Sequence, residues 1–152
     1  MSTAAEPRDR ATRRADTLAM LAGPQIDVWV ATATTGGDPY LVPLSLAWIG
    51  ERAVIAVEEG SVTARNLAGG RSARLAVGPT RDVVLLDVDL ERIVGVDDEA
   101  ELGAAYAAQA DWDPRGLAGY VFVVLRPTRV QAWREANELR GRLLMRHGEW
   151  LP

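Results

Sequence analysis

The sequence predicts a mainly β protein of six to eight mostly antiparallel strands, closed into a barrel and flanked by two or three helices. Segments rich in valine, isoleucine and aromatic residues recur along the chain, and short glycine turns join consecutive ones. The chain of 152 residues is long enough for one domain and too short for two ordinary ones. We therefore expect a disordered polar tail over residues 1–10 and a single domain over residues 11–152.

The first half of the chain holds two predicted helices among four strands. Residues 11–21 carry apolar side chains at helical spacing, and Gly23 with Pro24 ends that helix. A second, short helix over 61–68 has serine and threonine at its start as caps. The strands expected in this half are 26–34, 39–48, 52–57 and 71–77.

Proline occurs inside the second predicted strand, at Pro43. Proline has no backbone N–H, so within a sheet it is confined to edges and bulges. We therefore expect one side of the strand backbone to be free at Pro43, where something other than a neighbouring strand can bind.

The second half of the chain predicts a long strand over 81–96, an alanine-rich helix over 100–110, and further strands at 119–125, 127–133 and a final hairpin in 142–151. Asp87, Asp89 and Glu91 alternate, so they share one face of the long strand. Alternating carboxylates can form an acid–base pair. Here we interpret them as the solvated side of an antiparallel sheet.

Composition excludes several classes of chemistry. The chain has no cysteine, which rules out disulfides, thiolate catalysis and iron–sulfur clusters. All 17 basic residues are arginine, so no lysine Schiff base can form. One histidine, His147, cannot build a histidine-rich metal site, and no metal site is expected. A net charge of -4 predicts neither a nucleic-acid nor a membrane partner, and the charged N-terminus, without an apolar signal segment, predicts a cytoplasmic location.

The segment Glu58-Glu-Gly-Ser-Val-Thr-Ala-Arg-Asn-Leu67 follows a predicted strand and opens a helix. Free amides at a helix N-terminus, serine and threonine hydroxyls and a nearby arginine together form a site for a phosphate group. The alternative interpretation is an ordinary capped helix with a surface arginine.

The order of strands, glycine turns and the proline-containing strand, followed by Thr63-Ala-Arg65-Asn66-Leu67, resembles the pyridoxamine 5'-phosphate oxidase-like split-barrel superfamily. This superfamily includes flavin- and deazaflavin-dependent oxidoreductases of actinobacteria. The C-terminal stretches 127–135 and 141–150 are also similar to actinobacterial members, and the resemblance covers residues 20–151.

The resemblance implies a split β-barrel of the FMN-binding type, a homodimer, and FMN or the deazaflavin coenzyme F420 in a groove between subunits. It implies an oxidoreductase that transfers hydride between this cofactor and a small organic substrate. The cofactor-binding residues that it implies are Ser61, Thr63, Arg65 and Asn66 for the phosphate, Pro43, Leu44 and Ser45 for the ring, and Trp133 and Arg134 from the other subunit. No catalytic residue is assigned; Tyr40, Tyr120 or solvent are the candidates for an acid.

Two positions depart from the family's pattern, in which a lysine often stands in place of Thr63 and a basic residue in place of Ser61. Two alternatives therefore stay open: a non-catalytic dimer that binds flavin, haem or another flat ligand, and a dimer that has lost its cofactor. Trp29 and Trp48 fall in predicted strands and are expected in the core. The tryptophans near loops, Trp112, Trp133 and Trp150, suit an interface or a ring-stacking site.

Overall fold

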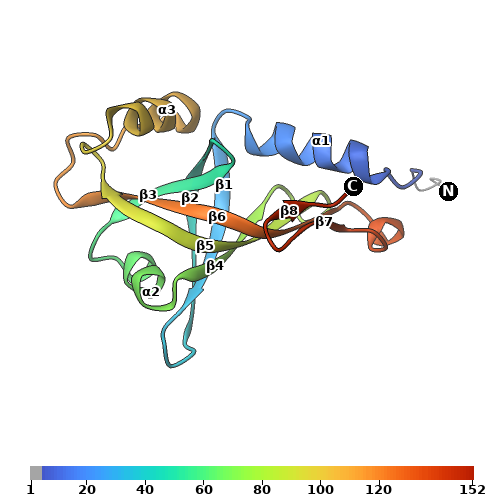
Figure 1. The fold of residues 1–152 in the computed structure, drawn as a ribbon, viewed down its shortest axis with the longest axis horizontal. Helices are drawn as coiled ribbons and strands as arrows, with labels where there is room; N and C mark the ends of the chain where they lie inside the picture. The colour runs from blue at the N-terminus through green and yellow to red at the C-terminus, as the bar shows by residue number, and fades with distance from the viewer. Residues whose placement is uncertain (1–4) are drawn as a thin grey trace.

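Eight strands and three α-helices follow one another along residues 5–152, the residues that the computed structural model describes (Figure 1). The helices are α1 (Arg10–Leu21), α2 (Val62–Gly70) and α3 (Ala100–Ala110), with a short 3-10 helix at Ala136–Glu138. The strands are β1 (Ile26–Ala33), β2 (Pro39–Ile49), β3 (Arg52–Glu58), β4 (Ser72–Val77), β5 (Val83–Gly95), β6 (Tyr120–Trp133), β7 (Leu143–Arg146) and β8 (Glu149–Trp150).

Six of the strands close into an antiparallel barrel. Their spatial order is β3-β2-β1-β4-β5-β6, and β3 pairs back onto β6. The β7–β8 hairpin extends the sheet beyond β6. The predicted mainly β, antiparallel barrel with flanking helices is therefore confirmed.

The two strands predicted at 119–125 and 127–133 form one long strand, β6. Val88 of β5 lies opposite Pro127 and Asp87 lies opposite Arg129, so Thr128 is an extra residue in a bulge. A bulge leaves a backbone group outside the ladder, which is where a strand tolerates proline. The separation into two strands was wrong because the bulge absorbs Pro127 without ending the pairing.

Apolar side chains form two cores, one inside the barrel and one between the barrel wall and α3. The interior core includes Val28, Val30, Leu46, Ile55, Leu75, Leu86, Val123 and Leu125. In the second core, Leu102 and Tyr106 of α3 pack against Val54 and Phe122 on the outer side of β3 and β6. This helix explains why β3 is buried on both faces and reads as an unbroken apolar run.

Trp29 does not lie in the core, contrary to prediction. Its neighbours Val28 and Val30 point into the barrel, and since successive side chains of a strand alternate, Trp29 points outward and is 50% exposed. Trp48 is half-buried and packs against the interior core.

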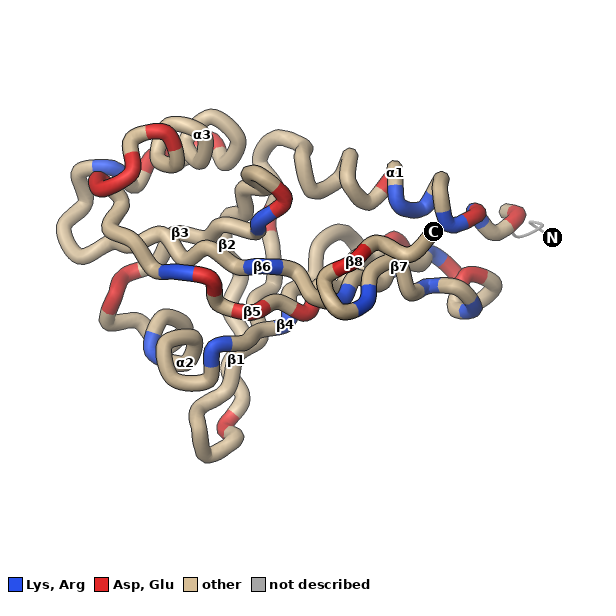
Figure 2. The backbone as a smooth tube through the Cα atoms, viewed as in Figure 1, with Lys and Arg blue, Asp and Glu red and all other residues tan. Residues whose placement is uncertain are grey.

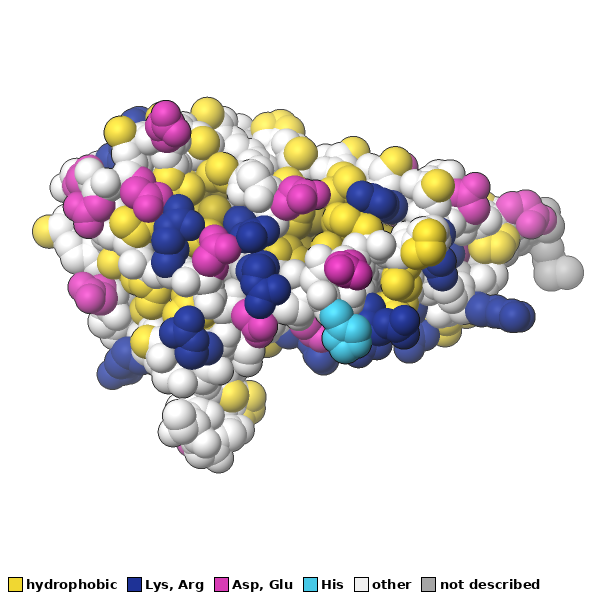
Figure 3. Space-filling model, viewed as in Figure 1, with side chains coloured by type: hydrophobic (Ala, Val, Ile, Leu, Met, Phe, Trp, Pro, Cys, Tyr) yellow, Lys and Arg dark blue, Asp and Glu magenta, His cyan; other side chains and the backbone are white. Residues whose placement is uncertain are grey.

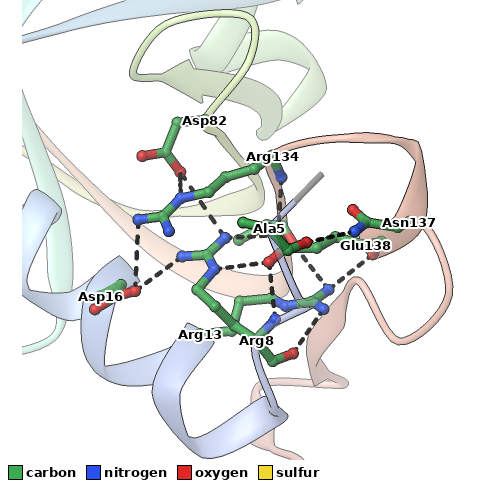
Figure 4. A network of polar contacts seen from close by, with 9 residues as sticks. Ala5, Arg8, Arg13, Asp16, Asp82, Arg134, Asn137 and Glu138 are labelled. Atoms are coloured by element: carbon green, nitrogen blue, oxygen red, sulfur yellow. Dashed lines mark hydrogen bonds and ion pairs between the residues drawn. The ribbon is translucent and has the colours of Figure 1, made fainter. Parts of the chain in front are cut away.

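The N-terminal segment is attached to the C-terminal part of the chain (Figure 4). Residues 1–4 of the tail predicted over 1–10 lie outside the described residues. The main chain of Ala5 accepts a hydrogen bond from Asn137, and Arg8 pairs with Glu138 at 2.8 Å. Arg13 of α1 is buried and donates to the carbonyls of Ala132, Glu138 and Arg8.

Candidate functional site

Strand β2 is paired on only one side along most of its length. Residues 39–46 pair with β1, whereas pairing with β3 is confined to Ala47–Ile49. Figure 1 shows β1 and β2 extending together below the rest of the barrel. The backbone of β2 before Ala47 therefore presents a free edge, and this is the part of the strand that contains Pro43.

The hydroxyl of Tyr106 lies where the β2–β3 ladder stops. Continuing the register of the two strands would place Ser45 opposite Ala56. Instead, the Tyr106 hydroxyl donates to the Ser45 carbonyl at 3.2 Å and accepts from the Ala56 N–H. The side chain is fully buried, and burial raises the pKa of this phenol above its ordinary value. A neutral hydroxyl from α3 thus takes the place of a strand-to-strand hydrogen bond.

The hydrogen bond between Tyr106 and Ser45 also shows to which side the backbone groups of Pro43 point. The N–H and C=O groups of alternate residues point to the same side of a strand. Since the Ser45 carbonyl meets Tyr106 on the side away from β1, Pro43 also presents its backbone to that side. The missing N–H of proline therefore removes no hydrogen bond from the β1–β2 ladder.

A pocket of about 370 Å³ lies along this edge. Its walls come from β2, the end of β3, the start of α2, the loop after α3 and the start of β6. The lining residues are Tyr40, Val42, Pro43, Leu44, Ser45, Ala56, Val57, Glu58, Ser61, Thr63, Trp112 and Tyr120. Three aromatic rings, several aliphatic side chains and a few hydroxyls make it a site for a flat, largely apolar ligand.

The aromatic wall is supported from the core. Trp112 meets Tyr120 edge-on with ring centroids 5.9 Å apart, and it meets Tyr106 at 6.2 Å in the same way. Tyr106 in turn packs on Phe122 at 5.0 Å. Edge-to-face pairs hold rings in defined orientations, so the pocket side of Trp112 and Tyr120 is presented by a packed cluster.

The start of α2 adds backbone donors to the pocket. Ser61 is the N-cap residue, and its hydroxyl accepts from the Ala64 N–H at 3.1 Å. The amides of Val62 and Thr63 form no hydrogen bond to another residue within 5–152. Free amides at a helix N-terminus attract anionic groups. The only charged side chain in the lining, however, is the carboxylate of Glu58.

The described residues were also compared with three other kinds of site: a metal site, a membrane-spanning helix and a pair of catalytic carboxylates. No group of three or more histidine, aspartate or glutamate side chains within 5–152 is placed to hold a metal ion. None of the helices in this range has the length and apolar character that crossing a membrane requires. The alternating carboxylates of β5 form ion pairs on the barrel surface: Asp87 with Arg74, Asp89 with Arg126 and Glu91 with Arg52.

Comparison with known proteins identifies the fold through structure. No protein-family model matches the chain, and no curated protein sequence matches it either. An F420 reductase superposes with a TM-score of 0.62 at 20% identity, over 74% of this chain and 94% of its own. A haem-binding protein from Mycobacterium smegmatis has a TM-score of 0.64 at 25% identity, over 95% of this chain and 60% of its own. Campylobacter jejuni ChuZ has a TM-score of 0.68 at 13% identity, over 97% and 67%.

The chain has the pyridoxamine 5'-phosphate oxidase-like split-barrel fold. The resemblance inferred from the sequence is thus confirmed at the level of fold. The division between β2 and β3, held by Tyr106, is the place where this chain's split barrel opens.

The split barrel brings five of the nine predicted site residues together. Pro43, Leu44 and Ser45 from β2 line the pocket beside Ser61 and Thr63 at the start of α2. Their role in binding a cofactor stays a prediction.

The other four predicted residues do not line the pocket. Arg65 is exposed on α2, and the buried Asn66 donates to the Thr32 hydroxyl at 3.0 Å, which attaches α2 to β1. Trp133 lies beneath the guanidinium of Arg142. Arg134 pairs with Asp82 at 3.3 Å. The predicted role of Trp133 and Arg134 requires a second subunit and stays a prediction.

Two residues of the site were missed in the sequence. Tyr106 is the single aromatic residue in an alanine-rich helix, and this was the available signal that one large side chain is buried there. In the sequence, Glu58 belongs to the segment before α2 and carries no separate signal for a site. Its place in the pocket depends on how β3 ends, which no local pattern specifies.

Proposed function

We propose that this protein is a homodimeric oxidoreductase that binds FMN or coenzyme F420 in the β2 pocket and transfers hydride to or from a small organic substrate. The observation that carries the proposal is the pocket itself, which joins a free strand edge, a helix N-terminus and an aromatic wall. Superposition on an F420 reductase supports the same assignment. We propose a cytoplasmic location for it.

The residues of the pocket suit the ring of such a cofactor. A flavin-type ring is flat and carries hydrogen-bonding groups along one side. The N–H of Ser45 and the C=O of Pro43 lie on the free side of β2 and would bind that polar side. Trp112 and Tyr120 would enclose the ring faces and exclude water. The cofactor would supply the hydride chemistry, and the protein would orient the ring.

The pocket is less suited to the phosphate end of such a cofactor than to its ring. The Val62 and Thr63 amides would bind a phosphate, but the Glu58 carboxylate lies in the same pocket and repels it. The Glu58→Gln variant should bind FMN roughly three- to tenfold more tightly than the wild type in a fluorescence titration.

Two controls isolate the charge effect. Glu59→Gln removes the same charge from an adjacent exposed residue outside the pocket, and it should change the affinity less than twofold. Riboflavin, which has no phosphate, should bind both variants and the wild type alike. Equal tightening of riboflavin and FMN by Glu58→Gln would show that Glu58 acts on the ring rather than on the phosphate.

The dimer is proposed from an exposed apolar face on β1 and β2. Trp29 is 50% exposed and Leu41 is 60% exposed. The register places Trp29 opposite Pro43 and Ala31 opposite Leu41, so these side chains share the outward face. Contiguous apolar surface of this kind marks protein interfaces. A second copy on this face would adjoin the edge of the pocket.

Sedimentation analysis tests the dimer through Trp29→Glu. The charge would be buried against the partner, so the dimer dissociation constant should rise at least about tenfold. Leu117→Glu changes a residue of similar exposure in the loop before β6 and should leave the constant unchanged. A wild type that sediments as a monomer at micromolar concentration would show that the dimer proposal is wrong.

A second candidate is a haem-binding protein without turnover, which is favoured by the M. smegmatis protein and by HutZ, the haem storage protein of Vibrio cholerae, at 16% identity and a TM-score of 0.58. The chain has a single histidine, and its position argues against ligation of a haem iron in the β2 pocket. His147 lies in the β7–β8 turn, is exposed, and is not among the residues that line the β2 pocket.

The deciding experiment is a titration of the purified protein with FMN, coenzyme F420 and haem in turn. Saturable binding of FMN or F420 at one per chain, followed by reduction and reoxidation with a substrate, supports the oxidoreductase. Saturable binding of haem alone supports the second candidate. Binding of none of the three leaves a split barrel that has lost its cofactor.

A further inference from the structure

A second concave site lies at the end of the molecule formed by β7, β8 and the start of α1. Its volume is about 530 Å³, and it shares no lining residue with the β2 pocket. Four arginines from four parts of the chain line it: Arg10 of α1, Arg129 of β6, Arg142 before β7 and Arg146 at the end of β7. Figure 2 shows basic positions of the hairpin and of α1 at this end, near the C-terminus.

The four arginines differ from most others in the chain because no aspartate or glutamate side chain among the described residues pairs with them. Among the described residues, ion pairs are formed by Arg8, Arg52, Arg74, Arg81, Arg92, Arg115, Arg126 and Arg134. None of the four pocket arginines forms one, and the lining contains no aspartate or glutamate. Residues 1–4 contain no acidic side chain either.

Two of these arginines form hydrogen bonds from their guanidinium groups. Arg142 donates to the Gln131 amide oxygen at 3.0 Å and to the Leu139 carbonyl at 3.1 Å. Arg10 donates to a main-chain oxygen of Pro152, the last residue of the sequence, at 2.6 Å. Neutral acceptors position a guanidinium without cancelling its charge, so Arg142 is oriented and still cationic.

Arg129 and Arg146 form no hydrogen bond from their side chains to another residue in the described range, although carboxylates are near both. Asp87 lies opposite Arg129 in the sheet, but its carboxylate binds Arg74 at 2.6 Å. Glu149 lies opposite Arg146 in the hairpin and forms no ion pair with it. Figure 3 shows basic side chains gathered here around the histidine. The guanidinium groups of both arginines are therefore available to a ligand.

We propose that this arginine pocket, defined by Arg10, Arg129, Arg142 and Arg146, binds a small molecule that carries at least two phosphate or carboxylate groups. The guanidinium group presents its N–H donors as a fork that matches both kinds of anion. The charges of Arg129, Arg142 and Arg146 are uncancelled, and three such charges in one concave surface exceed what a single phosphate can neutralise. The net charge of the chain is -4, so this concentration of positive charge is local and does not reflect a basic protein.

Calorimetric titration with inorganic pyrophosphate, in 0.15 M salt, tests the proposal. Saturable binding at one per chain is expected, with inorganic phosphate at least about tenfold weaker. The double variant Arg129→Gln/Arg146→Gln should bind pyrophosphate at least about tenfold more weakly than the wild type. Both side chains are exposed and make no contact that folding requires, so the variant should keep the wild-type thermal midpoint.

The matched control is Arg81→Gln/Arg115→Gln, which removes the same net charge from two exposed, ion-paired arginines elsewhere. It should change pyrophosphate affinity less than twofold. Equal weakening in the two double variants would mean a general charge effect and would overturn the proposal, as would the absence of binding at this salt concentration. A parallel titration with citrate distinguishes the two sources of charge: tighter citrate binding assigns the site to a polycarboxylate, and tighter pyrophosphate binding to a polyphosphate.

Discussion

Replacing Glu138 by glutamine is expected to lower the free energy of unfolding by about 3 kcal/mol. The Glu138 side chain is almost completely buried and accepts hydrogen bonds from the main chain and guanidinium of Arg8 and from the main chain of Arg134 (Figure 4). Three carboxylates pair with Arg8, whose own side chain is only 10% exposed, and the substitution removes the buried one of the three. Arg8 keeps Asp16 at 3.0 Å and Asp82 at 3.9 Å, but these carboxylates are 44% and 33% exposed and compensate less than the buried one does.

Urea denaturation of the wild type and of two variants measures this effect. Glu135→Gln is the matched control, because Glu135 pairs with Arg81 at 2.8 Å on the surface, where both side chains are more than half exposed. Surface ion pairs contribute about 0–1 kcal/mol, so this control should change stability little. Equal stabilities for Glu138→Gln and Glu135→Gln would show that the N-terminal segment is not held by this contact.

The same contact predicts an acid dependence of stability. The hydrogen bond from Arg8 lowers the pKa of Glu138 from 4.5 to about 2, against the opposing effect of burial. A carboxyl with a lowered pKa stabilises the fold fully above its unfolded pKa, and this contribution is lost as the pH falls through the folded pKa. The difference in stability between the wild type and Glu138→Gln should therefore be constant above about pH 5 and shrink as the pH falls toward 2.

Replacing Tyr106 by phenylalanine is expected to lower the free energy of unfolding by about 2 kcal/mol. The ring still fills its place against Phe122, so the packing of the α3 core is kept. Loss of the hydroxyl leaves the Ser45 carbonyl and the Ala56 N–H without their hydrogen-bond partner. Buried backbone groups without partners account for the cost.

Hydrogen exchange at the Ala56 amide gives a second readout that general destabilisation would not reproduce. Loss of protection at Ala56 beyond the change at other β3 amides is expected, because its acceptor has been removed. Tyr40→Phe is the control, since Tyr40 is 38% exposed at the other end of the pocket and its hydroxyl makes no hydrogen bond to another described residue. Unchanged stability and protection in Tyr106→Phe would mean that the opening between β2 and β3 does not depend on this hydroxyl.

The local patterns of the sequence were sufficient to predict most elements. The helix predicted over 100–110 is α3, and Ser61 caps α2. The free backbone side expected at Pro43 is present, because a residue without an N–H can be placed only where no strand needs that donor. These features depend on neighbours within a few residues, so the sequence specifies them directly.

Long-range contacts account for what was missed. Trp29 was expected in the core, but alternation along β1 turns it outward once Val28 and Val30 face the barrel interior. Arg65 and Asn66 belong to the motif that suggested a phosphate site; Arg65 is exposed and Asn66 attaches α2 to Thr32, and their role in binding stays a prediction. The elements that pack on a strand or helix decide which of its sides is buried. The sequence of a single segment does not specify those neighbouring elements.

By itself, the sequence determined most of the strands and turns, the split-barrel resemblance and the exclusion of thiol and lysine chemistry, because composition and short-range periodicity carry that information. Only the tertiary structure decided which residues share a site. Tyr106 reaches between β2 and β3 from α3, and arginines as distant as Arg10 and Arg146 converge on one pocket. Folding brings these groups together although they are far apart in the sequence. A local pattern of residues carries no information on such long-range contacts.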